Sequence, residues 1–258
     1  MAGRIKNILD NGSAFYIITG SFGKSIRFAF SGNNNKLFSI KLQNGKNVIL
    51  RKSTTDKDVF LTVFFSKYHR SPIHLGNSPV IIDLGCNIGL TLIDFLQEYP
   101  DAKITGVEMD PENFAIAKIN TKQFPDVTLI QKAVWKSEGT VQYDGPDSQS
   151  YSVSNSSEKK FNTESITMNG ILNQVPGGKA DYLKMDIEGS EYAILLESND
   201  TGWLKKIKYL SVEIHNTNEY DSESGLKKII NVLEKNSFIA WRSTTHWSSV
   251  FAINKEMI

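Results

Sequence analysis

From residue 79 onward, short apolar runs alternate with longer stretches in which apolar residues recur at helical spacing. The runs predict strands at 80–84, 103–108, 127–134, 180–185 and 209–214, and the stretches predict helices at 89–99, 111–123, 190–198 and 224–236. Two further runs, 238–242 and 249–253, have only a short polar linker between them and are expected to pair antiparallel. This alternation predicts an α/β fold, an open and mostly parallel sheet with a closing antiparallel strand and helices on both faces. In such sheets, ligands bind beyond the carboxyl ends of the strands.

The first part of the chain has a different pattern. Four apolar runs, 14–19, 25–30, 37–42 and 47–51, predict short strands, and Asn44-Gly45 predicts a type I′ hairpin turn between the last two. Residues 54–68 follow as a helix that is apolar nearly all round, with Thr55 as its N-cap and Asp58 as its capping-box partner. Two prolines and a glycine in 71–79 end this part. We expect a β-rich segment, 1–78, whose helix covers one side of the ligand cleft, and a ligand-binding domain, 79–258.

Composition and charge narrow the class of protein. The 258 residues carry a formal net charge of +1 and are 40% hydrophobic, which is typical of a folded protein without a field that attracts nucleic acid or anionic membranes. We therefore expect no nucleic-acid partner. No apolar stretch approaches roughly 18 residues, so no membrane span is expected, and the N-terminus lacks the apolar core of a signal peptide. Cys86 is the single cysteine, which excludes a disulfide framework, and a cytoplasmic location is expected.

The stretch DLGCNIG stands where the first parallel strand turns into its helix. Gly85 permits a tight turn and the close approach of a ligand, and Gly89 permits close packing at the start of the helix. The spacing is neither the dinucleotide fingerprint nor a phosphate loop, and a plain connection is the alternative. Cys86 is interpreted as a small loop residue, because no histidine or second cysteine lies close in sequence to activate a thiol. We assign the turn to cofactor binding: Asp83, Gly85, Cys86, Asn87 and Gly89.

The next two strand ends extend this candidate site. Glu108 ends the second strand, 19 residues after Gly89, where an acid can accept hydrogen bonds from both hydroxyls of a ribose. The alternative is a surface acid in front of a helix. Met109 and Asn113 follow in the same segment and are assigned to the same site. Ala133 and Val134 end the third strand, where the backbone can contact an adenine ring, and plain strand core is an equal alternative.

Taken together, DLGCNIG, VEMDPEN, YLKMDIEGSE and VEIH resemble the motifs of the FkbM family of methyltransferases, and the resemblance extends over roughly Asn47 to Ile214. It implies S-adenosylmethionine as the cofactor and a Rossmann-like class I methyltransferase sheet with a reversed final strand. It also implies that Gly85, Asn87 and Gly89 hold the amino-acid part of the cofactor and that Glu108 holds its ribose. Residues 144–160 and the part after His215 match only loosely, which leaves the methyl acceptor open.

Charged residues gather at the ends of the fourth and fifth parallel strands. Asp186 ends one strand, and Glu213 and His215 end the next, so they are expected to converge beside the methyl donor as catalytic residues. Asp186 is also assigned to cofactor binding. A histidine with a carboxylate partner is a natural general base for a hydroxyl acceptor. The same three residues could instead hold a divalent metal such as magnesium. A satisfied structural histidine is the alternative for His215.

A few other polar residues are weaker candidates. Arg51, Asp56 and Glu188 are assigned to acceptor binding, with a hairpin end, a helix cap and a favourable charge at a helix N-terminus as the alternatives. The histidines without a partner at metal spacing are interpreted as structural or exposed: His69, His74 and His246.

The sequence therefore predicts an S-adenosylmethionine-dependent methyltransferase that acts on a hydroxyl of a sugar, a glycan or a secondary metabolite. The alternatives are a nucleoside- or dinucleotide-binding oxidoreductase, which the glycine spacing disfavours, and a non-catalytic cofactor-binding partner protein. The N-terminal segment is expected to shape the acceptor pocket or to carry a homodimer contact. Residues 144–160 are either a lid over the site or a surface loop.

Overall fold

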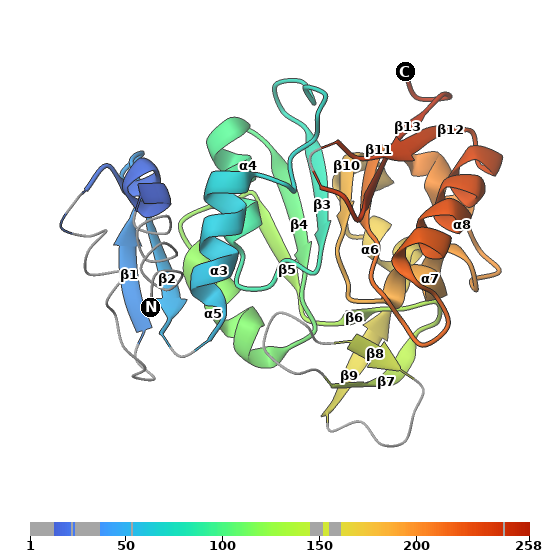
Figure 1. Cartoon of the computed structure of the whole chain (residues 1–258), viewed down its shortest axis with the longest axis horizontal. Helices are drawn as coiled ribbons and strands as arrows, with labels where there is room; N and C mark the ends of the chain where they lie inside the picture. The colour runs from blue at the N-terminus through green and yellow to red at the C-terminus, as the bar shows by residue number, and fades with distance from the viewer. Residues whose placement is uncertain are drawn as a thin grey trace, which may run out of the picture.

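The computed structural model describes residues 13–21, 23, 37–52, 54–144, 152–154, 161–244 and 246–258. Within this part of the chain, seven strands form one sheet in the order β12-β13-β11-β10-β3-β4-β5. The strands from β11 to β5 run parallel, and β13 runs antiparallel to both of its neighbours (Figure 1). The predicted α/β sheet with a reversed closing strand is confirmed.

The elements of this sheet follow the predicted alternation, with ends within a few residues of those expected. Their bounds are β3 Val80–Leu84, α4 Leu90–Glu98, β4 Lys103–Val107, α5 Pro111–Thr121, β5 Val127–Ile130, β10 Ala180–Met185, α7 Ser190–Leu195, β11 Ile207–Glu213, α8 Ser222–Lys235, β12 Phe238–Arg242 and β13 Ser249–Asn254.

Alternate residues of each strand face opposite layers of helices. Ile81 and Tyr182 pack in one apolar cluster with residues of α4, and Ile82 and Leu183 pack in another with residues of α7 and α8. Figure 1 shows α3, α4 and α5 on one side of the sheet and α6, α7 and α8 on the other. Because both faces of the central strands are buried, their sequences are continuous apolar runs rather than alternating ones.

The topology creates a crevice at one edge of the sheet. The chain runs outward from β3 to β4 and β5 and then returns to β10 on the other side of β3. The carboxyl ends of β4, β3 and β10 are level, since Leu84 pairs with Val107 on one side and with Met185 on the other. At such a reversal of strand order the connections diverge, which leaves room for a ligand.

A second sheet, which the sequence pattern did not predict, follows β5. It contains β6 (Ala133–Val134), β7 (Gly139–Asp144), β8 (Ser152–Ser154) and β9 (Phe161–Ile166) in the order β6-β9-β7-β8, and α6 (Met168–Leu172) follows it. The single predicted strand 127–134 is wrong in its second half, because the chain leaves the main sheet after Ile130 and β6 pairs with β9. Apart from β8, the residues after Asp144 assigned to a lid or a surface loop lie outside the described part of the chain.

Before the main sheet in the sequence, β1 (Leu37–Lys41) and β2 (Asn47–Arg51) form the predicted antiparallel hairpin. Its turn is not the predicted type I′, because Gly45 has a positive φ of 84° and Asn44 does not. The N–H of Gly45 donates to the carbonyl of Leu42 at 3.0 Å, so a type I turn is followed by a glycine bulge.

The predicted strand at 14–19 is wrong, because residues 13–19 are helical. Ala14, Phe15 and Ile18 are buried whereas Tyr16 and Ile17 are exposed, which is helical spacing rather than alternation. The run has five apolar or aromatic residues followed by Thr19, and so short a run fits both the helical and the strand period. Tertiary packing decides between the two. The predicted strand 25–30 lies outside the described residues.

The predicted helix 54–68 is formed by α3 (Asp56–Leu61) and a π-helix, Thr62–Ser66. The predicted capping box is wrong, since the side chain of Thr55 makes no capping hydrogen bond. The side chain of Asn120 in α5 connects the N-terminal hairpin to the main sheet. Asn120 accepts from the N–H of Ile49 in β2 at 2.6 Å and donates to the carbonyl of Ile88 at 2.8 Å. The hairpin is thereby fixed to the turn after β3.

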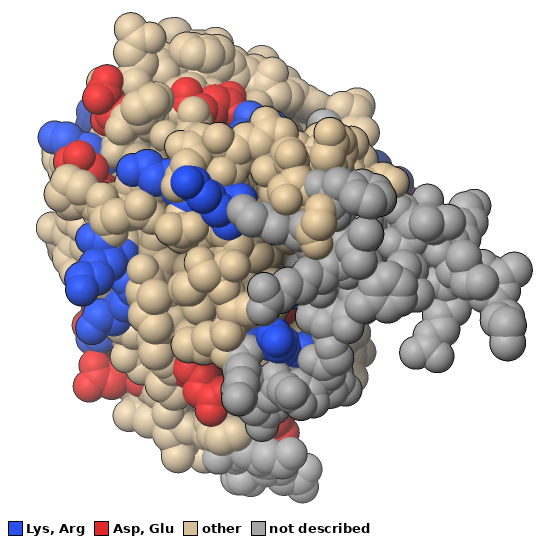
Figure 2. Space-filling view, turned by 90° about the vertical axis from the view of Figure 1, so that its left-hand side faces the viewer, with Lys and Arg blue, Asp and Glu red and all other residues tan. Residues whose placement is uncertain are grey.

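The described residues on the N-terminal side form no large area of one charge (Figure 2). Figure 2 shows this face, on which basic and acidic side chains are scattered among uncharged ones. Of the helices that the structure describes, none has the length and apolar character needed to cross a bilayer.

Candidate active site

A cavity of about 280 Å³ lies beyond the carboxyl ends of β3, β4, β10 and β11. It brings together most of the residues assigned to the cofactor: Gly85, Cys86, Asn87, Glu108, Met109, Asn113, Ala133, Val134 and Asp186. Three residues assigned to the acceptor side line the same cavity: Glu188, Glu213 and His215. Both halves of the predicted site therefore open into one space.

The glycine turn after β3 is tight because another strand end lies against it. A Cβ atom on Gly85 would lie 1.9 Å from the carbonyl oxygen of Asp186, and the φ of Gly85 is +79°. The N–H groups of Gly85 and Cys86 both donate to the carbonyl of Val107, at 2.9 and 3.0 Å. Gly89 does not line the described cavity wall but allows α4 to pack on α5, since its Cβ would lie 3.3 Å from the Cα of Ala117.

Glu108 closes the turn from the end of β4. Its Oε2 accepts from the N–H of Asn87 at 2.9 Å, and its Oε1 accepts from the N–H of Asp110 at 2.8 Å. Burial, and next the charge of Asp110, raise the pKa of Glu108 to about 7 against the effect of these hydrogen bonds. A carboxylate desolvated in this way gains from any ligand that donates hydrogen bonds to it.

Three predicted site residues lie behind the cavity wall instead of in it. Asp83 is fully buried, accepts a hydrogen bond from Thr91, and forms an ion pair with Lys184 at 3.2 Å. Arg51 and Asp56 form an ion pair at 2.8 Å, and Arg51 also donates to the Oδ1 of Asn113 at 2.7 Å. None of the three belongs to the described lining, although two of them contact residues that do.

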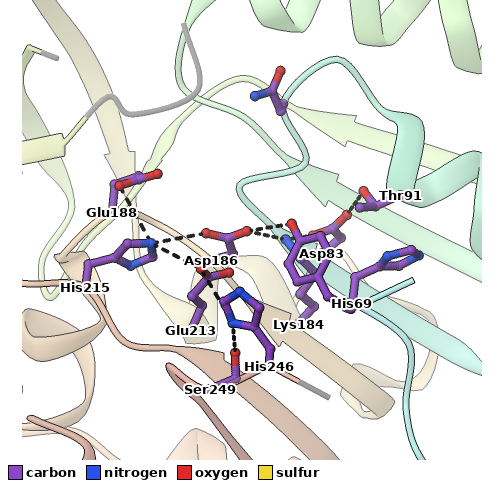
Figure 3. Close-up of polar contacts among 12 residues, drawn as sticks. His69, Asp83, Thr91, Lys184, Asp186, Glu188, Glu213, His215, His246 and Ser249 are labelled. Carbon is purple, nitrogen blue, oxygen red and sulfur yellow. Dashed lines mark hydrogen bonds and ion pairs between the residues drawn. The ribbon is translucent and has the colours of Figure 1, made fainter. Parts of the chain in front are cut away.

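The acceptor half is a cluster of acids around one imidazole. The Nε2 of His215 lies 3.6 Å from Asp186, 3.7 Å from Glu188 and 3.9 Å from Glu213. Figure 3 shows His215 and Glu188 on one side of Asp186, with Lys184 and Asp83 on the other. The predicted convergence of Asp186, Glu213 and His215 is therefore present, and Glu188 joins it.

A fourth acid holds the imidazole in place. Glu191 is fully buried, and its Oε1 accepts from both the backbone N–H of His215 at 2.9 Å and the ring Nδ1 at 3.1 Å. Its Oε2 accepts from the N–H of Gly189 at 2.8 Å. Because Nδ1 is engaged, Nε2 is the ring atom directed at the other carboxylates.

These neighbours set the protonation of the cluster. Burial disfavours the imidazolium, but the hydrogen bond and charge of Glu191 and the charges of Asp186 and Glu188 raise the pKa of His215 to about 10. Burial, followed by the charge of Asp186, raises the pKa of Glu213 to about 8. Near pH 7, His215 carries a proton and Glu213 is mostly neutral, whereas Asp186 is ionised.

Lys184 keeps Asp186 ionised. Its Nζ lies 3.1 Å from Oδ2 of Asp186 and 3.2 Å from Oδ1 of Asp83. Although burial opposes ionisation, the charges of Lys184 and His215 lower the pKa of Asp186. Lys184 itself is buried between the two acids, which hold its pKa well above the usual value against the desolvation of the ammonium.

Two cavity residues were missed or misread in the sequence. Tyr68, which follows the π-helix, and His246, which precedes β13, both line the cavity. The Nδ1 of His246 lies 3.1 Å from the hydroxyls of Ser248 and Ser249, and burial lowers the pKa of this histidine. Neither residue carries a sequence signal, because each reaches the site from a segment outside the strand-end motifs.

Comparison with known proteins identifies relatives of this chain. The family model described as the methyltransferase FkbM domain matches residues 83–240, more than half of the chain. The 2-O-methyltransferase NoeI of Sinorhizobium fredii (strain NBRC 101917 / NGR234) is 24% identical over 196 residues, which cover 67% of this chain and 79% of that protein.

The similarity to solved structures is low. The fibrillarin pre-rRNA processing protein of Methanococcus jannaschii is 12% identical with a TM-score of 0.48, covering 86% of this chain and 84% of that one. The precorrin-6y C5,15-methyltransferase of Geobacter metallireducens GS-15 is 13% identical with a TM-score of 0.43, covering 83% of this chain and 94% of that one. At these values, neither structure bears on the chemistry of this chain.

Proposed function

The chain belongs to the FkbM methyltransferase family and is an S-adenosylmethionine-dependent methyltransferase, and we propose that it methylates a hydroxyl oxygen of a sugar, a glycan or a secondary metabolite. The observation that carries the proposal is the shared cavity, in which the Glu108 carboxylate and the glycine turn face the acid–imidazole cluster at Asp186 and His215. The name of NoeI, a 2-O-methyltransferase, supports oxygen as the acceptor atom. The oxidoreductase alternative is not favoured.

The residues of the first half fit the cofactor. Glu108 offers carboxylate oxygens to the ribose hydroxyls, and the turn from Gly85 to Asn87 offers backbone groups to the amino-acid part. Met109, Ala133 and Val134 supply an apolar wall for the adenine. When bound, S-adenosylmethionine supplies a methyl group on a positively charged sulfur, which leaves as a neutral thioether.

In the second half, Asp186 is the group that takes the acceptor proton. A hydroxyl becomes strongly acidic as its oxygen bonds to the methyl carbon, so a carboxylate of low pKa is basic enough at that stage. His215 and neutral Glu213 donate hydrogen bonds that orient the acceptor oxygens, because both carry protons near pH 7. This assignment changes the role of His215 from the predicted general base to a donor.

A divalent cation is a second candidate for activating the hydroxyl. Ligand atoms of Asp186, Glu188 and His215 lie within 4.8 Å of one another, so Glu188 replaces Glu213 in the predicted trio. Two carboxylates and an imidazole suit Mg²⁺ or Mn²⁺ if oxygen ligands complete the shell. The hydrogen bond between Nδ1 of His215 and Glu191 resembles the carboxylate contact that usually orients a metal-bound histidine. Such an ion would take the place of the proton on Nε2.

The metal candidate predicts a specific binding defect. In calorimetric titrations with MnCl₂ in the presence of S-adenosylhomocysteine, we expect Glu188→Gln to weaken Mn²⁺ binding at least about tenfold, since it removes a ligand charge. Glu213→Gln serves as the matched control, because Glu213 lies next to the three candidate ligands but is not one of them. It is expected to weaken Mn²⁺ binding less than Glu188→Gln does. No Mn²⁺ binding by the wild type, or equal binding by all three proteins, would rule out this candidate.

Cofactor binding is expected to depend on Glu108 and on pH. Glu108→Gln should weaken S-adenosylhomocysteine binding about 10–100-fold, because hydrogen bonds to a charged carboxylate contribute roughly 1.5–3 kcal/mol. In the wild type, affinity should fall as the pH drops through about 7, since protonation removes the carboxylate acceptor. Glu197→Gln, at an exposed ion pair with Lys136, is the control. Calorimetry between about pH 6 and 8 checks both effects, and a pH-dependent Glu108→Gln variant would contradict the assignment.

The acceptor class is tested by mass spectrometry of methyl transfer from S-adenosylmethionine to a panel of neutral sugars, oligosaccharides, phenols and amines. Transfer to a hydroxyl supports the proposal. Transfer to nitrogen or carbon acceptors alone would overturn it, while leaving the methyltransferase assignment in place.

A further inference from the structure

The two oxygens of Asp186 have different surroundings. Oδ2 accepts a hydrogen bond from the hydroxyl of Tyr68 at 3.0 Å and one from Nζ of Lys184 at 3.1 Å. Oδ1 is the oxygen that faces Nε2 of His215, at 3.6 Å. One oxygen is therefore fixed by two donors on the protein side, and the other is directed at the acceptor cluster.

Tyr68 reaches this position from outside the region matched by the family model, which begins at residue 83. It directly follows the π-helix and Lys67, whose φ of 53° turns the chain sharply. π-Helical turns frequently occur at functional sites. The backbone that presents Tyr68 is thus an unusual local structure rather than the continuation of α3.

The residues after Tyr68 anchor this turn to the sheet. His69 and Arg70 both contact Asp94 of α4, at 3.0 and 2.5 Å. The hydroxyl of Tyr182 in β10 donates to the carbonyl of His69 at 2.8 Å. These contacts are buried or partly buried, so the turn is held against β10, the strand that Asp186 directly follows.

We infer that Tyr68 is a positioning residue for methyl transfer: together with Lys184 it locks Oδ2 of Asp186 and leaves Oδ1 as the oxygen that receives the acceptor hydroxyl. This inference rests on the role proposed above for Asp186. Lys184 alone would not fix the carboxyl group, because it is shared with Asp83 and a single donor permits rotation.

A purely structural role for Tyr68 would depend on the packing of its ring and not on its hydroxyl. Its ring centroid lies 5.7 Å from that of His69 and 5.5 Å from that of His246, so the ring also contributes packing. Phenylalanine preserves that packing and removes only the hydroxyl. If packing were the whole role, Tyr68→Phe would change neither the turnover number nor the orientation of Asp186.

The test uses Tyr68→Phe in the full chain. We expect kcat to fall about 10–100-fold on whichever acceptor the wild type methylates, with KM for S-adenosylmethionine and the affinity for S-adenosylhomocysteine within about twofold of wild type. Tyr99→Phe is the matched control, since its hydroxyl accepts from the N–H of Leu75 at 3.4 Å and does not belong to the described cavity lining, and it should keep wild-type kcat.

A crystal structure of Tyr68→Phe with S-adenosylhomocysteine supplies a readout that needs no acceptor. Rotation of the Asp186 carboxyl group supports the inference, and an unchanged carboxyl group with unchanged kcat overturns it. If the wild type methylates only nitrogen or carbon, the proposed function fails, yet kcat on that acceptor and the carboxyl orientation still decide the role of Tyr68.

Discussion

Replacing Gly85 with alanine is expected to abolish cofactor binding and to destabilise the protein. The new Cβ would lie 1.9 Å from the carbonyl oxygen of Asp186, a backbone atom that cannot move aside like a flexible side chain. Relief requires either the turn after β3 or the end of β10 to shift, and these carry the two halves of the site. We expect S-adenosylhomocysteine affinity to fall at least ~100-fold and the free energy of unfolding to drop by roughly 2 kcal/mol or more. Calorimetry and thermal unfolding measure the two effects.

Gly76 provides the matched control for this substitution. It has a φ of +93°, similar to the +79° of Gly85, but no atom of the described residues lies within 4 Å of the position its Cβ would take. Gly76→Ala therefore carries only the cost of a left-handed backbone, about 1–2 kcal/mol, and should bind S-adenosylhomocysteine like the wild type. If both variants lost the same affinity and stability, the need for glycine at position 85 would come from its backbone conformation and not from its contact with Asp186.

The main sheet could be predicted because its evidence is local. Strands buried on both faces are continuous apolar runs, and helices such as 222–235 have a regular apolar face, so period and order suffice. The second sheet could not be predicted in the same way. Its strands are short and half-exposed, and β6 is only two residues long. Its pairing with β9 joins segments separated by about thirty residues, and periodicity says nothing about such partners.

The residues of the site also differ in how far they could be predicted from local sequence. Glu108, Asp186 and His215 were predictable because the carboxyl ends of parallel strands meet at one edge of the sheet. The place of Glu188 beside Asp186 and His215 was not predictable, because Glu188 follows the strand with a positive φ of 52°, which strand alternation does not foresee. Tyr68 and His246 depend on the docking of distant segments. The orientation of Asp83 was not predictable either, because its side chain turns into the core toward Lys184.

The ionised carboxylate of Asp186 is expected to be the most important single group for the chemical step. Asp186→Asn keeps the shape of the side chain but removes its charge, and an amide has only one acceptor oxygen where the carboxylate has two. If that oxygen stays with Tyr68 and Lys184, the amide nitrogen faces His215 and the acceptor hydroxyl, and the proton has no acceptor. We expect kcat to fall roughly 10²–10⁴-fold. Because Asp83 still pairs with Lys184, the protein should remain folded and bind S-adenosylhomocysteine.

Asp181→Asn is the control for this prediction. Asp181 lies in the same strand at its opposite end, where its Oδ2 accepts from the N–H of Val80 at 2.8 Å, a bond that an asparagine oxygen can also accept. Single-turnover rates, measured with saturating cofactor, separate loss of chemistry from slow product release. An Asp186→Asn enzyme that keeps more than about a tenth of the wild-type rate would contradict the proton-acceptor role, which general acid–base catalysis places at two orders of magnitude or more. The proton would then have to leave through another group, and neutral His246 on the far side of Glu213 would be the next residue to substitute.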